Sequence, residues 1–114
     1  MELREIQKLV YGEYVKNGFE DKWNKALPEY MGDLAELGLI HTEISEAMEE
    51  IRNGYDIGAI KELAGAIIRI LNFVSRKSNA LEPEKRYLLD IENIIMNEHE
   101  SNMKRPKYHG RKNI

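Results

Sequence analysis

Apolar side chains recur every three or four residues along most of the chain, which is the spacing of one face of an α-helix. This pattern predicts four helices, over residues 2–16, 31–52 and 57–76 and from about Pro83 to the basic end of the chain. An Asn-Gly pair follows each of the first two, at 17–18 and 53–54, where glycine readily closes a helix. Over residues 19–30 the pattern predicts an irregular or partly helical connection. Because no alternating β-branched run bounded by hairpin turns is found, the expected class is all-α.

The helix expected at residues 57–76 is apolar on nearly all sides, which places it in the middle of the fold. Pro83 suits the first turn of the fourth helix, since an N–H group there has no partner to lose. Short loops between helices of this length favour antiparallel neighbours. The sequence therefore predicts a four-helix antiparallel bundle. A chain of 114 residues forms one domain with a modest core, which favours completion by oligomerisation.

Composition narrows the class of protein. With 42% hydrophobic and 32% charged residues, the chain is too apolar for disorder, and it has no apolar run that spans a membrane. We therefore expect a soluble protein with no membrane partner. The N-terminal residues mix charged with apolar side chains, unlike a secretory signal, so the cytoplasm is the expected location. Because the chain has no cysteine and 3 histidines, a metal site would need oxygen ligands, which suit Mg²⁺ or Mn²⁺.

Acidic residues of the second helix gather on one side. At about 100° per residue, four of them fall within an arc of roughly 80° beside the apolar stripe. They are Glu36, Glu43, Glu46 and Glu50. Like charges three or four residues apart repel, so the stripe needs a divalent metal ion or basic side chains from a neighbouring helix. For this helix taken alone, a solvated acidic face is the simpler interpretation.

The third helix carries three polar residues on one face, Glu62, Arg69 and Asn72, with Gly65 between them. An unpaired charge in a buried helix costs several kcal/mol, so these side chains need partners. If this face meets the acidic stripe, the two enclose an acidic pocket. The alternative is an internal salt bridge in which Arg69 neutralises Glu62 or a glutamate of the second helix. The pattern leaves both hypotheses open.

Three segments together resemble the compact phage and bacterial members of the MazG-like all-α nucleotide pyrophosphohydrolase superfamily. They are LGLIHTEISEAMEEIRNG (37–54), KELAGAIIRILNF (61–73) and ESNMKRPKYHGRK (100–112), in the order and spacing of that group. VKNGFEDKWN (15–24) is a weaker match, and the likeness extends from about residue 32 to the C-terminus. The resemblance implies a MazG-like helical domain over residues 1–103. It also implies a basic tail, 104–114, that belongs to the same domain, and assembly as a homodimer or tetramer.

The resemblance further implies a Mg²⁺-dependent enzyme, with Mn²⁺ as the other candidate, that converts a nucleoside triphosphate to a monophosphate and pyrophosphate. Carboxylates of an E-E-x-x-E and an E-x-x-D run hold the ion, which neutralises phosphates and lowers the pKa of water. By position, Glu43, Glu46 and Glu62 are the metal-binding and catalytic residues. Gly65 stands where the group usually has aspartate, and Asn72 where related chains often do. These departures motivate the alternative of a catalytically impaired relative that binds nucleotide or serves as a helical interaction module.

Further residues follow from the same resemblance. Asn102, Lys104 and Arg105 match or neighbour an N-x-x-R-P element and are the expected phosphate-binding residues, since arginine suits bidentate phosphate contact. Weaker candidates for nucleotide contact are Trp23, Arg69 and Asn72, and core packing is the competing interpretation for Trp23. Nucleic acid is not an expected partner, because the body of the chain is acidic and only the tail would attract a polyanion.

Overall fold

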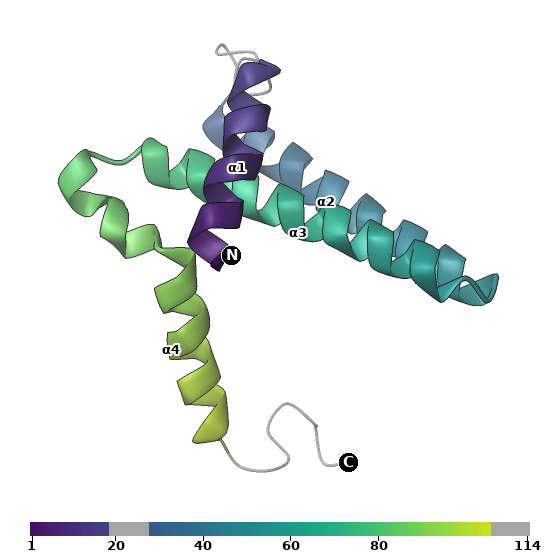
Figure 1. Ribbon diagram of the computed structural model, residues 1–114. Coiled ribbons are helices and arrows are strands. Elements are labelled where there is room, and N and C mark those ends of the chain that lie inside the picture. The colour runs from purple at the N-terminus through teal and green to yellow at the C-terminus, as the bar shows by residue number, and fades with distance from the viewer. Residues whose placement is uncertain (19–27, 106–114) are drawn as a thin grey trace.

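The computed structural model describes residues 1–18 and 28–105 (Figure 1). Its elements are α1 (Leu3–Lys16), α2 (Glu29–Arg52), α3 (Asp56–Asn79), the 3-10 helix η2 (Pro83–Leu89) and α4 (Ile91–Met103). These ranges contain no strand, so the predicted all-α class with four α-helices is confirmed. None of the described helices combines the length and the hydropathy that a membrane span requires.

The helices α2 and α3 form an antiparallel hairpin (Figure 1). Gly54 in the turn has φ of 74°, a left-handed conformation that costs glycine little. The N–H groups of Asn53 and Gly54 donate to the carbonyl oxygens of Glu49 and Ile51, at 3.1 and 3.0 Å. These bonds satisfy carbonyl groups that the end of α2 would otherwise leave unpaired. The predicted stop at the Asn-Gly pair is therefore confirmed.

The helix α1 crosses α3, and part of their contact is polar (Figure 1). Gln7 Nε2 donates to Ser75 Oγ at 2.9 Å, and Ser75 is buried. Because α3 contacts α1, α2 and η2, it lies in the middle of the fold, as its apolar sequence predicts. The buried apolar core is small and consists, among the described residues, of Ile40, Ala47, Ala59, Ala66 and Leu71.

The prediction of one continuous fourth helix from Pro83 is wrong. Residues 83–89 form the 3-10 helix η2, and α4 begins only after Asp90. Asp90 has φ of -75° and ψ of 109°, and its Oδ1 accepts from the backbone N–H groups of Glu92 and Asn93, at 3.1 and 3.4 Å. Such an N-cap satisfies N–H groups that have no partner inside the new helix. The chain therefore stops one helix and starts another within this segment.

The helix α4 leads away from the α2–α3 hairpin (Figure 1). Its first turn is fixed to α1, because Arg4 forms ion pairs with Asp90 at 2.9 Å and Glu92 at 3.0 Å. The radius of gyration is 16.8 Å, whereas a compact domain of this length has about 13 Å. The described part of one chain thus does not close an antiparallel four-helix bundle. Large apolar side chains stay exposed along α3, including Ile57, Ile60 and Ile67.

Ion pairs join the N-terminal half of α2 to the C-terminal half of α3. Arg76 pairs with Asp33 and, at 3.2 Å, with Glu36, while Lys77 lies 2.7 Å from Asp33 and 3.1 Å from Glu29. The Arg76, Asp33 and Glu36 side chains are only 12 to 17% exposed. Burial would raise the pKa of Asp33, but hydrogen bonds from Lys77 and Arg76 outweigh it and hold that pKa below its usual value. These residues form the structural ion network of the hairpin.

Arg76→Ala should lower the free energy of unfolding by about 3 kcal/mol, because it leaves poorly solvated carboxylates without their partner. Urea denaturation followed by circular dichroism measures the loss. The control is Arg52→Ala, which removes an exposed pair with Glu49, whose side chains are 65% and 63% exposed. It should cost less than about 0.5 kcal/mol. Equal losses in the two variants would contradict the role assigned to the ion network.

Candidate metal centre and adjoining cavity

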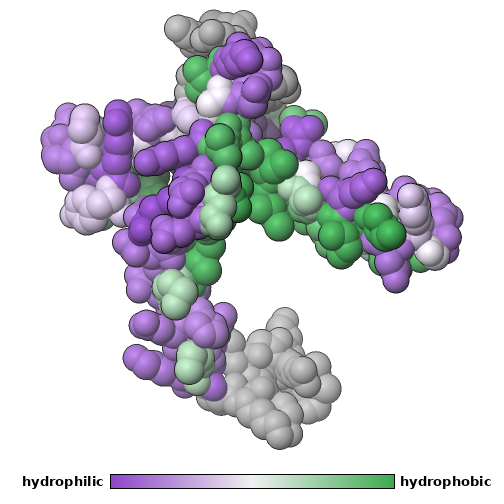
Figure 2. Space-filling model, viewed as in Figure 1, coloured by the Kyte–Doolittle hydropathy of each residue, from purple (hydrophilic) through white to green (hydrophobic). Residues whose placement is uncertain are grey.

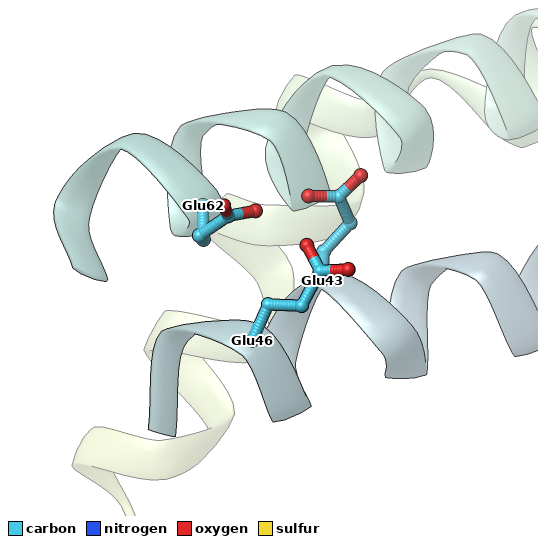
Figure 3. A group of neighbouring side chains, drawn as sticks. All are labelled: Glu43, Glu46 and Glu62. Atoms are coloured by element: carbon cyan, nitrogen blue, oxygen red, sulfur yellow. The ribbon is translucent and has the colours of Figure 1, made fainter. Parts of the chain in front are cut away.

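Three glutamate carboxylates meet between α2 and α3 (Figure 3). Glu43 and Glu46 lie one helical turn apart on α2, and Glu62 comes from the facing side of α3. One carboxylate oxygen of each residue lies within 4.8 Å of the other two. Within residues 1–18 and 28–105, this is the one group of at least three potential ligands close enough for a shared ion. We call these three residues the acidic cluster; they are the metal ligands that the sequence predicts.

The carboxylates of the acidic cluster perturb one another. Hydrogen bonding with Glu43 and then with Glu46, together with burial, raises the pKa of Glu62 to about 7. At neutral pH the cluster therefore shares a proton for part of the time, because three adjacent negative charges repel. A cation can take the place of that proton. Carboxylate oxygens are the ligands that hard divalent ions such as Mg²⁺ prefer, so the donor set fits such an ion.

Gly65 allows Glu43 to lie against α3. A Cβ atom at residue 65 would lie 2.9 Å from Glu43 Oε2, closer than real Cβ atoms approach another atom. The Glu43 carboxylate thus fills the space that a side chain at this position would need. The position where the sequence lacks an expected acid is covered by an acid from α2.

Arg69 neutralises part of the acidic cluster. Its Nε lies 3.0 Å from Glu43 Oε1, and the two side chains are 43% and 18% exposed. The internal salt bridge that the sequence left open is therefore formed, and Glu43 is the partner. Both sequence hypotheses hold in part, because Glu62 of α3 still lies close to Glu43 and Glu46 of α2.

Glu36 separates from the rest of the predicted acidic stripe. The Tyr14 hydroxyl donates to Glu36 Oε1 at 2.6 Å, and Arg76 pairs with the same carboxylate. Burial, and then this hydrogen bond, raise the pKa of Tyr14, so its hydroxyl keeps its proton. Glu36 consequently belongs to the structural ion network and not to the acidic cluster.

A partly open cavity of about 750 Å³ adjoins the acidic cluster and is lined by α1, α2 and α3. Glu43, Gly65 and Arg69 line it on the side of the cluster, and Leu9 and Ile68 contribute apolar wall from α1 and α3. Figure 2 shows hydrophobic side chains gathered where α1 crosses α3. Binding sites for small molecules combine such an apolar wall with a few polar groups, in volumes of about 300 to 1,000 Å³.

Asn72 places an unsatisfied polar group beside this cavity. The residue is 9% exposed and lines the cavity, and its Oδ1 atom has no hydrogen-bond partner among the described residues. A buried carbonyl group without a partner costs free energy, and an N–H or O–H group of a ligand would recover it. The contribution of α1 to the cavity, through Tyr14 and Leu9, was missed by the sequence prediction, because it depends on how α1 crosses α3.

The other predicted site residues lie elsewhere. Asn102, Lys104 and Arg105 are at the C-terminal end of α4, which leads away from the hairpin (Figure 1). In one chain they belong neither to the acidic cluster nor to the cavity lining. Trp23 and residues 106–114 of the tail fall outside the described residues. The structure therefore brings together the metal-ligand candidates, Arg69 and Asn72, but not the phosphate-binding candidates of the tail.

Comparison of the chain with protein-family models, with curated proteins and with solved structures finds no match. A function must therefore be inferred from the chemistry of the acidic cluster and the cavity. Both are formed by residues of the same hairpin, with α1 as the third wall of the cavity.

In the absence of metal, thermal stability should fall as the pH rises from about 5 to about 8. The pKa of Glu62 is about 7 in the folded protein against an ordinary value of 4.5, so the folded state binds more protons in this interval and loses that advantage as the pH passes 7. Thermal unfolding in a chelator measures the effect. Glu62→Gln should remove the loss, and Mg²⁺ or Mn²⁺ should reverse it above neutral pH. An identical pH dependence in Glu62→Gln would contradict the close approach of the carboxylates.

Proposed function

We propose that this protein is a Mg²⁺-dependent nucleoside triphosphate pyrophosphohydrolase, which releases a nucleoside monophosphate and pyrophosphate. The observation that carries the proposal is a three-carboxylate cluster beside a cavity of about 750 Å³, which one of its members, Glu43, lines. This volume suits a nucleoside. The resemblance of residues 32–114 to the MazG-like superfamily supports the same activity, with Mn²⁺ as the other candidate ion.

Each group of residues in the site has its own role in this reaction. Glu43, Glu46 and Glu62 supply hard oxygen ligands next to the cavity, and Glu43 lines its wall. These carboxylates would hold a divalent ion, which would supply charge neutralisation for the phosphates and a lowered pKa for the water that hydrolyses the α-phosphate bond. Arg69 and Asn72 line the cavity next to the cluster. There they would contact a bound nucleotide. The apolar wall from α1 excludes water from the base and sugar.

Assembly with further copies of this chain belongs to the same proposal. A single chain leaves apolar side chains exposed on α3 and α4, among them Ile60, Ile67 and Ile95. A homodimer or tetramer would cover these surfaces and complete the MazG-like bundle. It would also offer a route by which Asn102, Lys104 and Arg105 of one copy reach the phosphates bound by another.

The alternative proposal is a catalytically impaired relative that binds nucleotide or acts as a helical interaction module. Two observations favour it. Gly65 supplies no carboxylate where the resemblance leads us to expect one, and Arg69 already occupies one oxygen of Glu43. Both reduce the negative charge that is available to a metal ion.

With Mg²⁺ or Mn²⁺ present, the purified protein should release pyrophosphate from at least one nucleoside or deoxynucleoside triphosphate. Glu46→Gln should lower kcat by about a hundredfold or more, because a lost ligand weakens charge stabilisation in the transition state. Glu49→Gln is the matched control on the same helix, since Glu49 is exposed and, within the described part of the chain, its carboxylate pairs with Arg52 alone. A coupled pyrophosphate assay over a panel of nucleotides measures the rates. No release from any nucleotide with either metal would refute the proposed activity.

If the protein is an impaired relative, Gly65→Asp should raise its affinity for Mn²⁺ and its rate of pyrophosphate release. The added carboxylate would complete the ligand set, and calorimetric titration with Mn²⁺ measures the affinity. Gly65→Ala is the control for crowding, because it adds the same Cβ atom against Glu43 Oε2 without a charge. A wild-type protein that turns over as fast as Gly65→Asp would eliminate this alternative.

A further inference from the structure

Arg69 lies where the acidic cluster meets the cavity. Its Nε donates to Glu43 Oε1 at 3.0 Å, and its side chain is 43% exposed. Among the described residues the guanidinium makes no other hydrogen bond, so its outer N–H groups remain available. These groups form a rigid planar fork that matches the spacing of phosphate oxygens. Arg69 can therefore hold Glu43 and a phosphate at the same time.

The charges around Arg69 match one divalent ion. When ionised, the three carboxylates of the acidic cluster and the guanidinium of Arg69 leave two negative charges. Gly65 adds none. A second divalent ion would find one oxygen of Glu43 already bound to Arg69 and a site with no further excess of negative charge. The donor set of this chain is thus suited to a single ion.

A separate observation indicates that the cavity beside Arg69 holds a polar ligand. The Asn72 side chain, nine-tenths buried, lines the same cavity, and its Oδ1 has no partner among the described residues. Arg69 and Asn72 lie on the same helix, α3, so one ligand can contact the guanidinium and the carboxamide together.

We infer that Arg69 is a built-in cation that takes the place of a second metal ion. It keeps its hold on Glu43 while its outer N–H groups bind the phosphates of the nucleotide, so that each chain uses one divalent ion. This inference rests on the proposed function. It assigns Arg69 two opposing effects: it competes with metal for Glu43 and it attracts phosphate.

These two effects should separate in Arg69→Gln. The measurements are Mn²⁺ titration by electron paramagnetic resonance, and calorimetric titration of the Mn²⁺-loaded protein with inorganic pyrophosphate. Wild-type protein should bind one Mn²⁺ per chain. In Arg69→Gln the affinity for Mn²⁺ should rise several-fold, because Glu43 is released and the cluster is more negative. The affinity for pyrophosphate should fall about tenfold, because a charge-assisted hydrogen bond is lost.

Two further variants make the test specific. Arg69→Lys keeps the charge and loses the fork, so its Mn²⁺ affinity should stay near that of wild type and its pyrophosphate affinity should lie between the other two. Arg52→Gln removes an exposed arginine that pairs with Glu49 on α2, and both affinities should be unchanged. Thermal unfolding of each variant shows whether it is folded.

Several outcomes would overturn the inference. If the affinities for Mn²⁺ and for pyrophosphate both fall in Arg69→Gln, Arg69 has a structural role only. If neither affinity changes, Arg69 has no role in binding. Two Mn²⁺ ions per wild-type chain would also contradict it. If wild-type protein releases pyrophosphate but Arg69→Gln behaves as wild type, the inference fails and the proposed function stands. If wild-type protein binds no Mn²⁺, both fail.

Discussion

The pairing of Arg76 with Asp33 and Glu36 is the interaction on which the arrangement of the molecule depends. These side chains are largely buried, so each would be costly without its partner, and the ion pairs fix how α3 lies along α2. At the opposite end of the hairpin, the left-handed conformation of Gly54 sets the turn. The acidic cluster lies between these two fixed ends. The geometry of the hairpin therefore holds Glu62 of α3 close to Glu43 and Glu46 of α2.

The glutamates of α2 have different roles, which depend on the cations that they contact. Glu36 is satisfied by Arg76 and by the hydroxyl of Tyr14, and it contributes to the fold. The acidic cluster has fewer cations than carboxylates, since only Arg69 reaches it among the described residues. Its unbalanced charge shows in the pKa of Glu62, which is raised to about 7. A deficit of positive charge, and not the presence of acids alone, distinguishes the candidate site from the structural network.

Much of the fold and part of the site could be predicted from the sequence. The helical period and the Asn-Gly stops located three helices, and the resemblance selected Glu43, Glu46 and Glu62, which the structure brings together. The break at Asp90 was missed because an apolar period continues through it, although aspartate before a new helical run is an N-cap signal. The partner of Arg69 and the cavity depend on helix crossing, which local sequence does not encode.

The walls of the cavity differ in how firmly they are held. The hairpin walls rest on the ion network and on the small apolar core, whereas α1 contributes no buried residue of its own. The contacts that hold α1 include the hydrogen bond of Gln7 to Ser75 and the ion pairs of Arg4 at the start of α4. Elements with few buried apolar contacts open at low free-energy cost. The side of the site formed by the acidic cluster is therefore preformed, and the width of the cavity is set by the least firmly held helix. A ligand between them would stabilise α1 as well as satisfy Asn72.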